Sequence, residues 1–171
     1  MSSYEDRPPD PSSGPAEVPA DPDAFPAQGP DSLAGIGQRI LARILDALVL
    51  AVPAAALLLP QVSIDGDELS VDVPLWVTVA LFAMGFAYEV ALVAWRGQTV
   101  GKIALRIRVA RFTDGKVPAP SQAAIRHVLP AVIGVTPYVS ILALVVYVSA
   151  AWDPMKRGWH DKAAGTVVVR C

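Results

Sequence analysis

Cysteine is almost absent from this chain of 171 residues, because the single thiol is Cys171. One cysteine excludes an intramolecular disulfide and a metal site built from cysteines. Histidine is nearly as scarce: His127 and His160 are the only two, which excludes a multi-histidine site as well. We therefore expect neither a bound metal nor a cofactor.

Charged residues are also few. They make up 18% of the chain, whereas hydrophobic residues make up 53% and the formal net charge is −2. A soluble domain is usually about a quarter charged, so this chain has too few charged side chains for a water-facing surface. A near-neutral net charge also argues against a nucleic-acid binder. The composition indicates a small integral membrane protein whose partner is the lipid bilayer and no nucleic acid.

The first 38 residues differ in composition from the rest. They hold eight of the sixteen prolines, seven acidic residues and one base, Arg7. Such a segment cannot bury enough apolar surface to offset its chain entropy, which predicts disorder. We therefore divide the chain into a disordered, acidic, proline-rich tail at residues 1–34 and a transmembrane domain at residues 35–171. A tail of this kind can recruit a cytoplasmic partner.

Two long apolar segments follow the tail, at residues 40–59 and 75–95. Each has about 20 residues, which as a helix spans the roughly 30 Å hydrocarbon core of a bilayer. Trp76 and Trp95 stand at the two ends of the second segment, where interface anchors are common. The pattern predicts two transmembrane helices.

A third apolar stretch covers residues 127–152, but Pro130, Gly134 and Pro137 interrupt its first half. It is long enough for one crossing, and it also suits a re-entrant hairpin or two short crossings. Backbone that is not helical at membrane depth has to be shielded by protein or water. The sequence pattern alone leaves both arrangements open.

Loop charges predict the orientation. The loop at residues 60–74 carries four acids and no base, whereas the loop at residues 96–126 carries seven bases and one acid. Because basic residues stay on the cytoplasmic side, residues 96–126 and the N-terminus are predicted to be cytoplasmic. A single third crossing would place the four bases of residues 156–170 outside, which favours the re-entrant hairpin or two short crossings.

A β element is predicted after the second helix. Gly97 and Gly101 are interpreted as turn glycines that lead from the helix into a strand. Apolar residues then alternate at positions 103, 105, 107 and 109, Asp114-Gly115 is a hairpin-turn signal, and residues 167–169 form a β-branched run that can pair with this strand. The predicted fold is an all-α helical membrane protein with two transmembrane helices, a third broken apolar segment and a small cytoplasmic β-hairpin.

Asp46 and Glu89 are ionisable residues inside the two predicted spans. Arg39 precedes Asp46 by seven residues and Arg96 follows Glu89 by seven, so each acid shares a helix face with an arginine, and Arg43 is one turn from Asp46. A charge at mid-membrane costs about 2.5–3.5 kcal/mol. Two interpretations remain open: a polar site for ion or small-solute movement, and a salt-bridge clasp that fixes helix register.

Three blocks of sequence resemble the RDD family of bacterial integral membrane proteins. They are residues 37–46 (GQRILARILD), residues 97–102 (GQTVGK, with Asp114-Gly115 after it) and residues 157–168 (RGWHDKAAGTVV). The resemblance covers roughly residues 35–170. The family is named for one arginine and two aspartates: Arg39 and Asp46 match the arginine and the first aspartate, and Asp161 matches the second. The resemblance implies a multi-pass protein of the bacterial cytoplasmic membrane, with suggested roles in transport that include sodium/proton exchange in some members.

The leading hypothesis is therefore transport of an ion or small solute, including cation/proton exchange. Two or three helices hardly enclose a pathway alone, so this function requires a homo-oligomer or a membrane partner. The candidate residues form an intramembrane polar site and a second motif, in which Arg126 sits where the family often carries that residue type: Arg39, Arg43, Asp46 and Glu89, and Arg126, His160 and Asp161. The alternative is a non-transporting scaffold or accessory subunit that recruits a cytoplasmic partner through its proline-rich tail. The sequence shows no nucleophile, metal set or nucleotide motif, so we do not expect an enzyme.

Overall fold

The computed structural model describes residues 21, 23, 25–133, 145–146 and 148–171. Most of the predicted tail and the centre of the third apolar stretch lie outside the described residues. The last residues of the predicted tail are described: Asp31, Ser32 and Ala34 form backbone hydrogen bonds with residues 168–170, and Ser32 and Ala34 are buried. The described part is mostly helical. Its elements are α1 (Ile36–Leu58), η2 (Leu59–Gln61), β1 (Val62–Asp65), β2 (Glu68–Val71), α2 (Leu75–Arg96), α3 (Val100–Ala104), β3 (Ile107–Arg111), α4 (Pro120–Ile133), η3 (Ser149–Ala151), α6 (Trp159–Ala164) and β4 (Thr166–Arg170).

Helices α1 and α2 are long and apolar enough to cross a membrane, by length and composition. They have 23 and 22 residues, which corresponds to about 33 Å at 1.5 Å per residue. In the most apolar stretch of 18 residues, only 11% of the residues of α1 and 17% of those of α2 are buried inside the folded chain. The core helix of a soluble protein is mostly buried. Helix α2 matches its predicted segment to within one residue. Helix α1 begins four residues earlier than predicted, where the Gln38 side chain accepts a hydrogen bond from Gly35 N–H.

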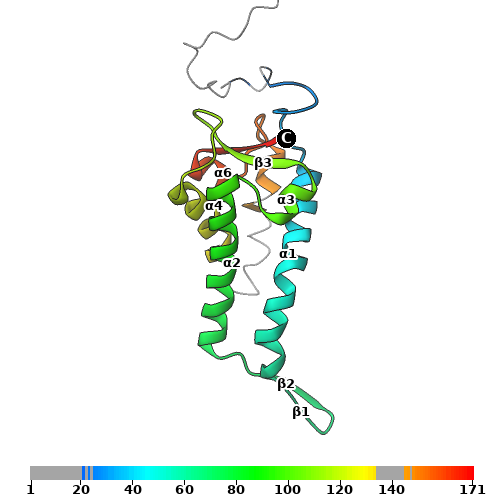
Figure 1. Ribbon diagram of the computed structural model, residues 1–171. Coiled ribbons are helices and arrows are strands. Elements are labelled where there is room, and N and C mark those ends of the chain that lie inside the picture. The colour runs from blue at the N-terminus through cyan, green and yellow to red at the C-terminus, as the bar shows by residue number, and fades with distance from the viewer. Residues whose placement is uncertain (1–20, 22, 24, 134–144, 147) are drawn as a thin grey trace, which may run out of the picture.

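The two long helices run side by side, with a different β element at each end (Figure 1). Strands β1 and β2 form an antiparallel hairpin in the acidic loop between the helices, with Val62 opposite Val71 and Gly66 in the left-handed conformation at the turn. All eight strand residues are exposed. This hairpin was not predicted, although the apolar residues Val62, Ile64, Leu69 and Val71 alternate with polar residues along its two strands.

Strands β3 and β4 form the second sheet, which confirms the predicted pairing of residues 167–169 with the strand near Arg106. They are antiparallel, from Ile107 opposite Arg170 to Arg111 opposite Thr166. The predicted hairpin is wrong, however, because the turn at Asp114-Gly115 does not lead into a partner strand. Gly115 adopts a left-handed conformation and Arg111 N–H donates to the Lys116 carbonyl, which closes the turn directly after β3.

The strand also begins later than predicted. Residues 100–104 form the short helix α3, so the alternation that starts at Ile103 is not that of a strand. These residues are helical because the beginning of α3 is hydrogen-bonded to a side chain of α1, a contact between distant parts of the chain that is described below. Strand β3 starts only at Ile107, after Arg106 has taken a left-handed conformation with φ +53°.

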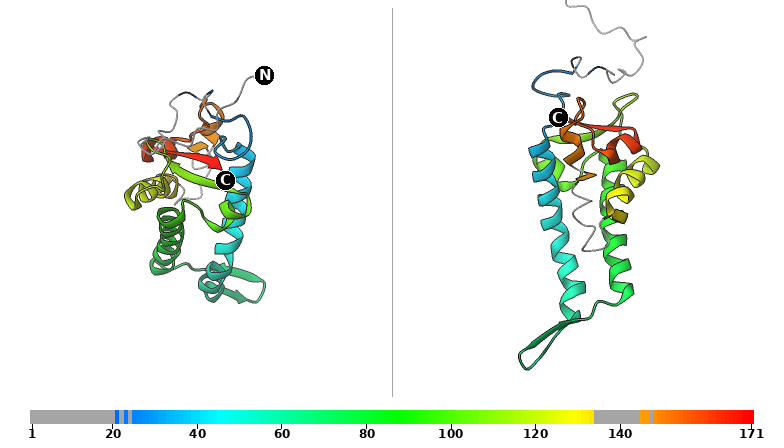
Figure 2. Two further views of the ribbon diagram at one scale, coloured as in Figure 1. Left: turned by 45° about the horizontal axis from the view of Figure 1, so that its top comes forward. Right: turned by 180° about the vertical axis from the view of Figure 1, so that it is seen from behind.

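The end of the chain lies at the same end of the helix pair as the start of α1 and the end of α2 (Figure 2). Strand β4 pairs with β3, and Val169 also forms a bridge with Leu33 just before α1. For a chain whose α1 and α2 both span the bilayer, a single further crossing would separate β4 from β3. The described residues on both sides of the third apolar stretch therefore lie at the same end of the helix pair.

The core sits under the sheet β3–β4, where the ends of α1 and α2 meet it. Its buried residues are small or β-branched: Ala34, Ala42, Val93, Ile107, Val109, Ala123 and Val168. Small side chains allow the backbones of the helices and the sheet to approach closely. This packing holds the charged residues of α1 and α2 against the elements that follow α2.

Candidate functional site

Asp46 on α1 holds the beginning of α3 in place. Its side chain is buried, and its Oδ1 accepts hydrogen bonds from the Tyr88 hydroxyl and from Gly101 N–H, each at 2.7 Å. Its Oδ2 accepts a hydrogen bond of 2.6 Å from the Thr99 hydroxyl. All three donors are uncharged, so Asp46 acts as a cap for the first turn of α3 rather than as the partner of an arginine.

The two predicted turn glycines have different roles. Gly97 ends α2 in a left-handed conformation with φ +70°, which confirms it as a turn residue. Gly101 instead lies inside α3, where a Cβ atom would collide with the carbonyl oxygen of Ala42 and stand 3.0 Å from the carboxyl carbon of Asp46. Gly101 is therefore needed for the close approach of α3 to α1.

Glu89 on α2 connects three other helices. Its Oε2 accepts a hydrogen bond from Nη1 of Arg43 on α1 and lies 2.9 Å from Nδ1 of His127 on α4. Its Oε1 lies 3.6 Å from Nζ of Lys102 on α3. The Glu89, Lys102 and His127 side chains are buried, whereas the Arg43 side chain is 43% exposed.

Lys102 links the surroundings of Glu89 to those of Asp46. Its Nζ donates to the Thr99 hydroxyl at 3.3 Å, and that hydroxyl in turn donates to Asp46. Burial lowers the pKa of Lys102 and the negative charge of Glu89 raises it, with a net result below the ordinary value of a lysine. Lys102 is thus a buried cation whose charged state depends on its carboxylate neighbours.

Asp161 on α6 is fully buried between two arginines. Its Oδ2 accepts a hydrogen bond of 3.0 Å from Arg39 Nη1, and its Oδ1 lies 2.9 Å from Arg126 Nη1. Gly158 N–H also donates to Oδ2 at 3.2 Å, so Asp161 caps the start of α6. Burial raises the pKa of Asp161, but the charges of Arg126 and Arg39 lower it more, and the net pKa lies below the usual range.

His160, beside Asp161 in the chain, is also buried. Its Nε2 lies 3.6 Å from Asp161 Oδ1. Burial lowers the pKa of His160 to about 4, although the charge of Asp161 opposes this effect. The imidazole is therefore neutral at neutral pH. Gly158 makes room for this ring, since a Cβ there would stand 2.7 Å from its Cε1.

The partners of Asp46 and Glu89 differ from those that sequence spacing predicts. Arg39 pairs with Asp161 and not with Asp46, and the exposed Arg96 lies over the ring of Trp95, 5.1 Å from its centroid. Spacing shows which residues share a helix face, but the partner on another element depends on how the elements pack.

Four residues of the site were not among those predicted: Tyr88, Thr99, Lys102 and His127. Each has a signal in the sequence. Thr99 and Lys102 belong to the GQTVGK block, Tyr88 precedes Glu89, and His127 follows Arg126. What the sequence does not contain is the contact between this block and Asp46, which lies 53 positions from Thr99.

One cavity of about 250 Å³ brings the two predicted groups together. The ionisable side chains that line it come from α1, α2, α3, α4 and α6: Arg39, Arg43, Asp46, Glu89, Lys102, Arg126 and His160. Among the described residues, no group of three or more histidine, cysteine and acidic side chains is arranged to hold a metal ion. The cavity lies near the end of the helix pair that carries β3 and β4.

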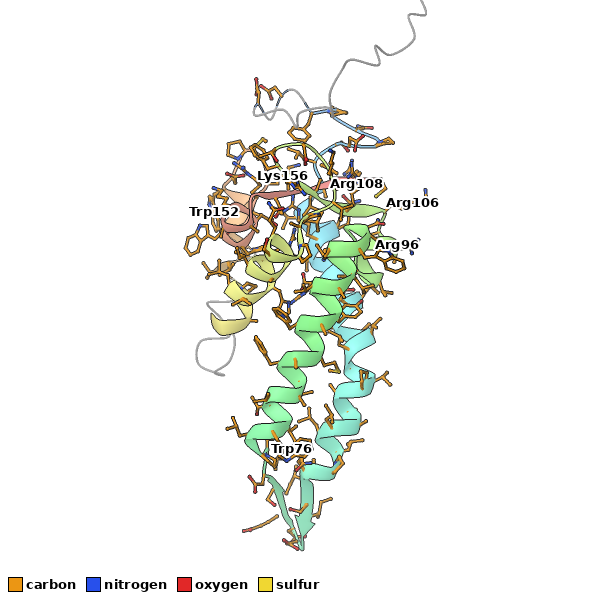
Figure 3. The ribbon with its side chains drawn as sticks, turned by 60° about the vertical axis from the view of Figure 1, so that its left-hand side comes forward. Trp76, Arg96, Arg106, Arg108, Trp152 and Lys156 are labelled. Carbon is orange, nitrogen blue, oxygen red and sulfur yellow. The ribbon has the colours of Figure 1, made fainter. Side chains whose placement is uncertain are left out.

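The surface of that end is basic and aromatic. Figure 3 shows Arg96, Arg106, Arg108, Lys156 and Trp152 around it, while Trp76 lies at the opposite end of α2. Trp76, Trp95 and Trp152 are each more than half exposed. This distribution suits two membrane interfaces with basic residues concentrated at one of them.

Comparison with known proteins gives one match. A family model described as "RDD family" matches residues 33–165, which cover most of the chain and the greater part of all three sequence blocks. No curated protein and no solved structure matches the chain.

Proposed function

The chain belongs to the RDD family, and from this premise we propose that it is a non-enzymatic, multi-pass protein of the bacterial cytoplasmic membrane that takes part in moving an ion or a small solute. The observation that supports the proposal most is the cavity beside two helices of membrane-spanning length, lined by four cationic and two acidic side chains. Ionisable groups at membrane depth are costly, and they mark ion and solute pathways.

Glu89 is the residue that we assign to solute movement. Asp46 and Asp161 each accept at least three hydrogen bonds or ion pairs that fix the start of a helix. Glu89 instead has its partners on three other helices, and one of them, Arg43, has a partly exposed side chain. Separation of Arg43 from Glu89 would open the cavity to a solute without unwinding a helix.

The proposed orientation places the cavity in the cytoplasmic half of the membrane. The hairpin β1–β2, with its acidic residues, lies at one end of the helix pair, and the basic loop after α2 lies at the other. The positive-inside rule then assigns the N-terminus, β3 and β4 to the cytoplasm.

Transport also requires more than one chain or a membrane partner. Large apolar side chains on both long helices are exposed, including Leu48 and Val52 on α1 and Val79 on α2. Two such helices do not surround a pathway. A homo-oligomer or a membrane partner would cover part of these faces and complete the path.

A second function is favoured by a specific observation, the three uncharged donors around Asp46. They support a structural task for this carboxylate, as expected if the charges only clasp the helices together. In that case the protein is a membrane scaffold or accessory subunit, and the acidic, proline-rich tail recruits a cytoplasmic partner.

Flux through proteoliposomes tests the proposal. The purified full-length protein is reconstituted, and sodium, potassium, proton and anion fluxes are compared with those of empty liposomes. We expect flux of at least one ion, loss of that flux in Glu89→Gln, and wild-type flux in Asp65→Asn, a matched carboxylate change in the exposed strand β1. Flux no higher than in empty liposomes for every ion would reject transport and favour the scaffold.

A further inference from the structure

The end of the helix pair that carries β3 and β4 has bases on its surface without an acidic partner. Arg96 and Arg106 are exposed, and Lys156 is partly exposed. In the part of the chain that the structure describes, none of these three side chains forms an ion pair. The acids of the neighbouring loops are paired with other bases: Asp31 with Arg108, Asp114 with Arg111, and Asp153 with Lys162. This surface therefore carries positive charge that the described chain does not neutralise.

The backbone at two of these bases would favour glycine. Arg106 has φ +53° and Lys156 has φ +54°, which is the left-handed region. A side chain with a Cβ atom is unfavourable in this region, and glycine adopts it freely. Local folding therefore does not explain a long basic side chain at either position, and a role outside the fold does.

Exposed tryptophans stand beside the bases. Trp95 is 73% exposed, and the guanidinium of Arg96 lies over its ring, 5.1 Å from the centroid. Trp152 is 77% exposed and precedes Lys156 by four positions. Figure 3 shows these bases and Trp152 around the same end of the molecule. Exposed indole rings beside bases are typical of the headgroup level of a membrane.

The length of α2 agrees with this depth. Trp76 and Trp95 stand 19 positions apart on the helix. This spacing corresponds to about 28 Å, close to the roughly 30 Å of a hydrocarbon core. With α2 across the bilayer, Trp95 and Arg96 therefore lie among the headgroups. The loop beside Trp76 carries four acids and no base, so only one of the two membrane surfaces meets bases.

We propose that Arg96, Arg106 and Lys156 bind the headgroups of anionic phospholipids at the membrane surface beside β3 and β4. Bases next to a membrane span are attracted to negatively charged headgroups, and the indole rings pack among the same headgroups. This inference rests on the membrane location proposed above and not on transport. The surface lies outside the cavity, since none of the three bases lines it.

The acidic tail is the other candidate partner of negative charge. Residues 1–24 contain six acidic residues and one base. Trp95 and Trp152 favour the lipid, because exposed indole rings gain from the headgroup region and gain little from a solvated acidic segment. The lipid is therefore the partner that we propose, and occupation by the tail is an outcome that the test recognises.

Thermal unfolding of the full-length protein in a non-ionic detergent tests the surface. One arm adds phosphatidylglycerol to the micelles, and the other adds phosphatidylcholine, whose headgroup has a phosphate but no net charge. We expect a saturable rise in the unfolding temperature, with a half-saturating concentration about tenfold or more lower for phosphatidylglycerol. Equal responses to the two lipids would overturn the inference. No response to phosphatidylglycerol, together with carbodiimide cross-linking of Lys156 to a carboxylate of residues 1–24, would overturn it in favour of the tail.

Variants separate binding from folding. Arg106→Gly and Lys156→Gly place glycine where the backbone favours it, so both should unfold near the wild-type temperature. Each should raise the half-saturating concentration of phosphatidylglycerol about fivefold. The matched control is Lys162→Gln, which removes one exposed base of the same end that is already paired with Asp153, and it should leave that concentration unchanged. Unchanged binding in both glycine variants, or an equal loss in Lys162→Gln, would overturn the assignment to these bases.

The two assays distinguish this inference from the proposed function. A preference for phosphatidylglycerol in a protein that gives no flux would reject transport and leave the lipid surface standing. Flux by a protein that binds both lipids equally would reject the lipid surface and leave transport standing.

Discussion

Arg39 on α1 donates a hydrogen bond of 3.0 Å to Asp161 on α6, although 122 positions separate them in the chain. Arg39 also donates to the carbonyl oxygens of Ala34 and Val168 at 3.3 Å. One arginine thus joins the start of the first long helix to α6 and β4. Arg39 and Asp161, which the sequence resemblance matches to the arginine and the second aspartate of the family, form one buried ion pair in this chain.

Asp161→Asn is expected to destabilise the protein by about 3–5 kcal/mol, because it leaves the charges of Arg39 and Arg126 without their buried counter-charge. Asp114→Asn breaks a more exposed pair with Arg111 and should cost less than about 1 kcal/mol. Denaturant unfolding in detergent measures both. Equal stability of the two variants would show that Asp161 has no special structural role.

Gly101→Ala is expected to destabilise the protein by about 1–3 kcal/mol, because the added methyl group meets the Ala42 carbonyl and the Asp46 carboxylate. Gly37→Ala is the matched control in α1, where a Cβ meets nothing within 4 Å. That change should be neutral or stabilising, since alanine favours a helix. Unfolding temperatures of the two variants in detergent check the difference, and a harmless Gly101→Ala would contradict the close packing of α3 on α1.

His160 predicts a pH dependence of stability. Its folded pKa of about 4 lies below the ordinary value of 6.5, so the unfolded chain binds more protons between these values. Stability should therefore decrease as the pH falls from 6.5 towards 4, by at most about 3 kcal/mol from this group. The lowered pKa of Asp161 acts only at lower pH, below the ordinary 3.8 of an aspartate.

The measurement is the slope of unfolding free energy against pH, in wild type and in His160→Gln. The variant should have a flatter slope between pH 6.5 and 4, whatever its absolute stability. Parallel slopes would mean that His160 is not kept neutral by the fold.

The single cysteine makes the topology directly measurable. Cys171 is exposed at the end that carries β3 and β4. A membrane-impermeant maleimide should leave Cys171 unmodified in intact cells. The same reagent should modify Cys171 once the cells have been permeabilised. Although Cys171 is accessible, partial burial of its thiol raises the pKa, so labelling is best done above neutral pH. The control is Asp67→Cys in a Cys171→Ser background, which places the thiol at the turn between β1 and β2 and should be labelled in intact cells.

The two long helices could be predicted because their signal is local. Twenty consecutive apolar residues need no information about distant contacts, and both helices fall within four residues of the predicted segments. The pairing of residues 167–169 with β3 could be predicted as well, because both strands are β-branched and the loop charges favour placing them on one side.

The remaining features depend on contacts that no local pattern contains. Residues 103–105 alternate like a strand, yet Asp46, more than 50 positions earlier, caps α3 and makes residues 100–104 helical. The pairing of Asp161 with Arg39 likewise depends on how α1 packs against α6. The residue types of the site were visible in the sequence, whereas their pairing was a property of the fold.

The comparison of Glu89→Gln with the paired variant Arg43→Gln/Glu89→Gln in the flux assay tests the central claim most directly. The paired change removes the ion pair of Arg43 with Glu89, and Lys102, which also faces Glu89, keeps its hydrogen bond to the Thr99 hydroxyl. A clasp is weakened by this change but a folded variant keeps its flux, whereas a solute site loses the group that contacts the solute. We predict that the paired variant remains folded, by its unfolding temperature, and loses the flux as Glu89→Gln does. A folded paired variant with wild-type flux would contradict the assignment of Glu89 to solute movement and would show that the charges only hold the helices together.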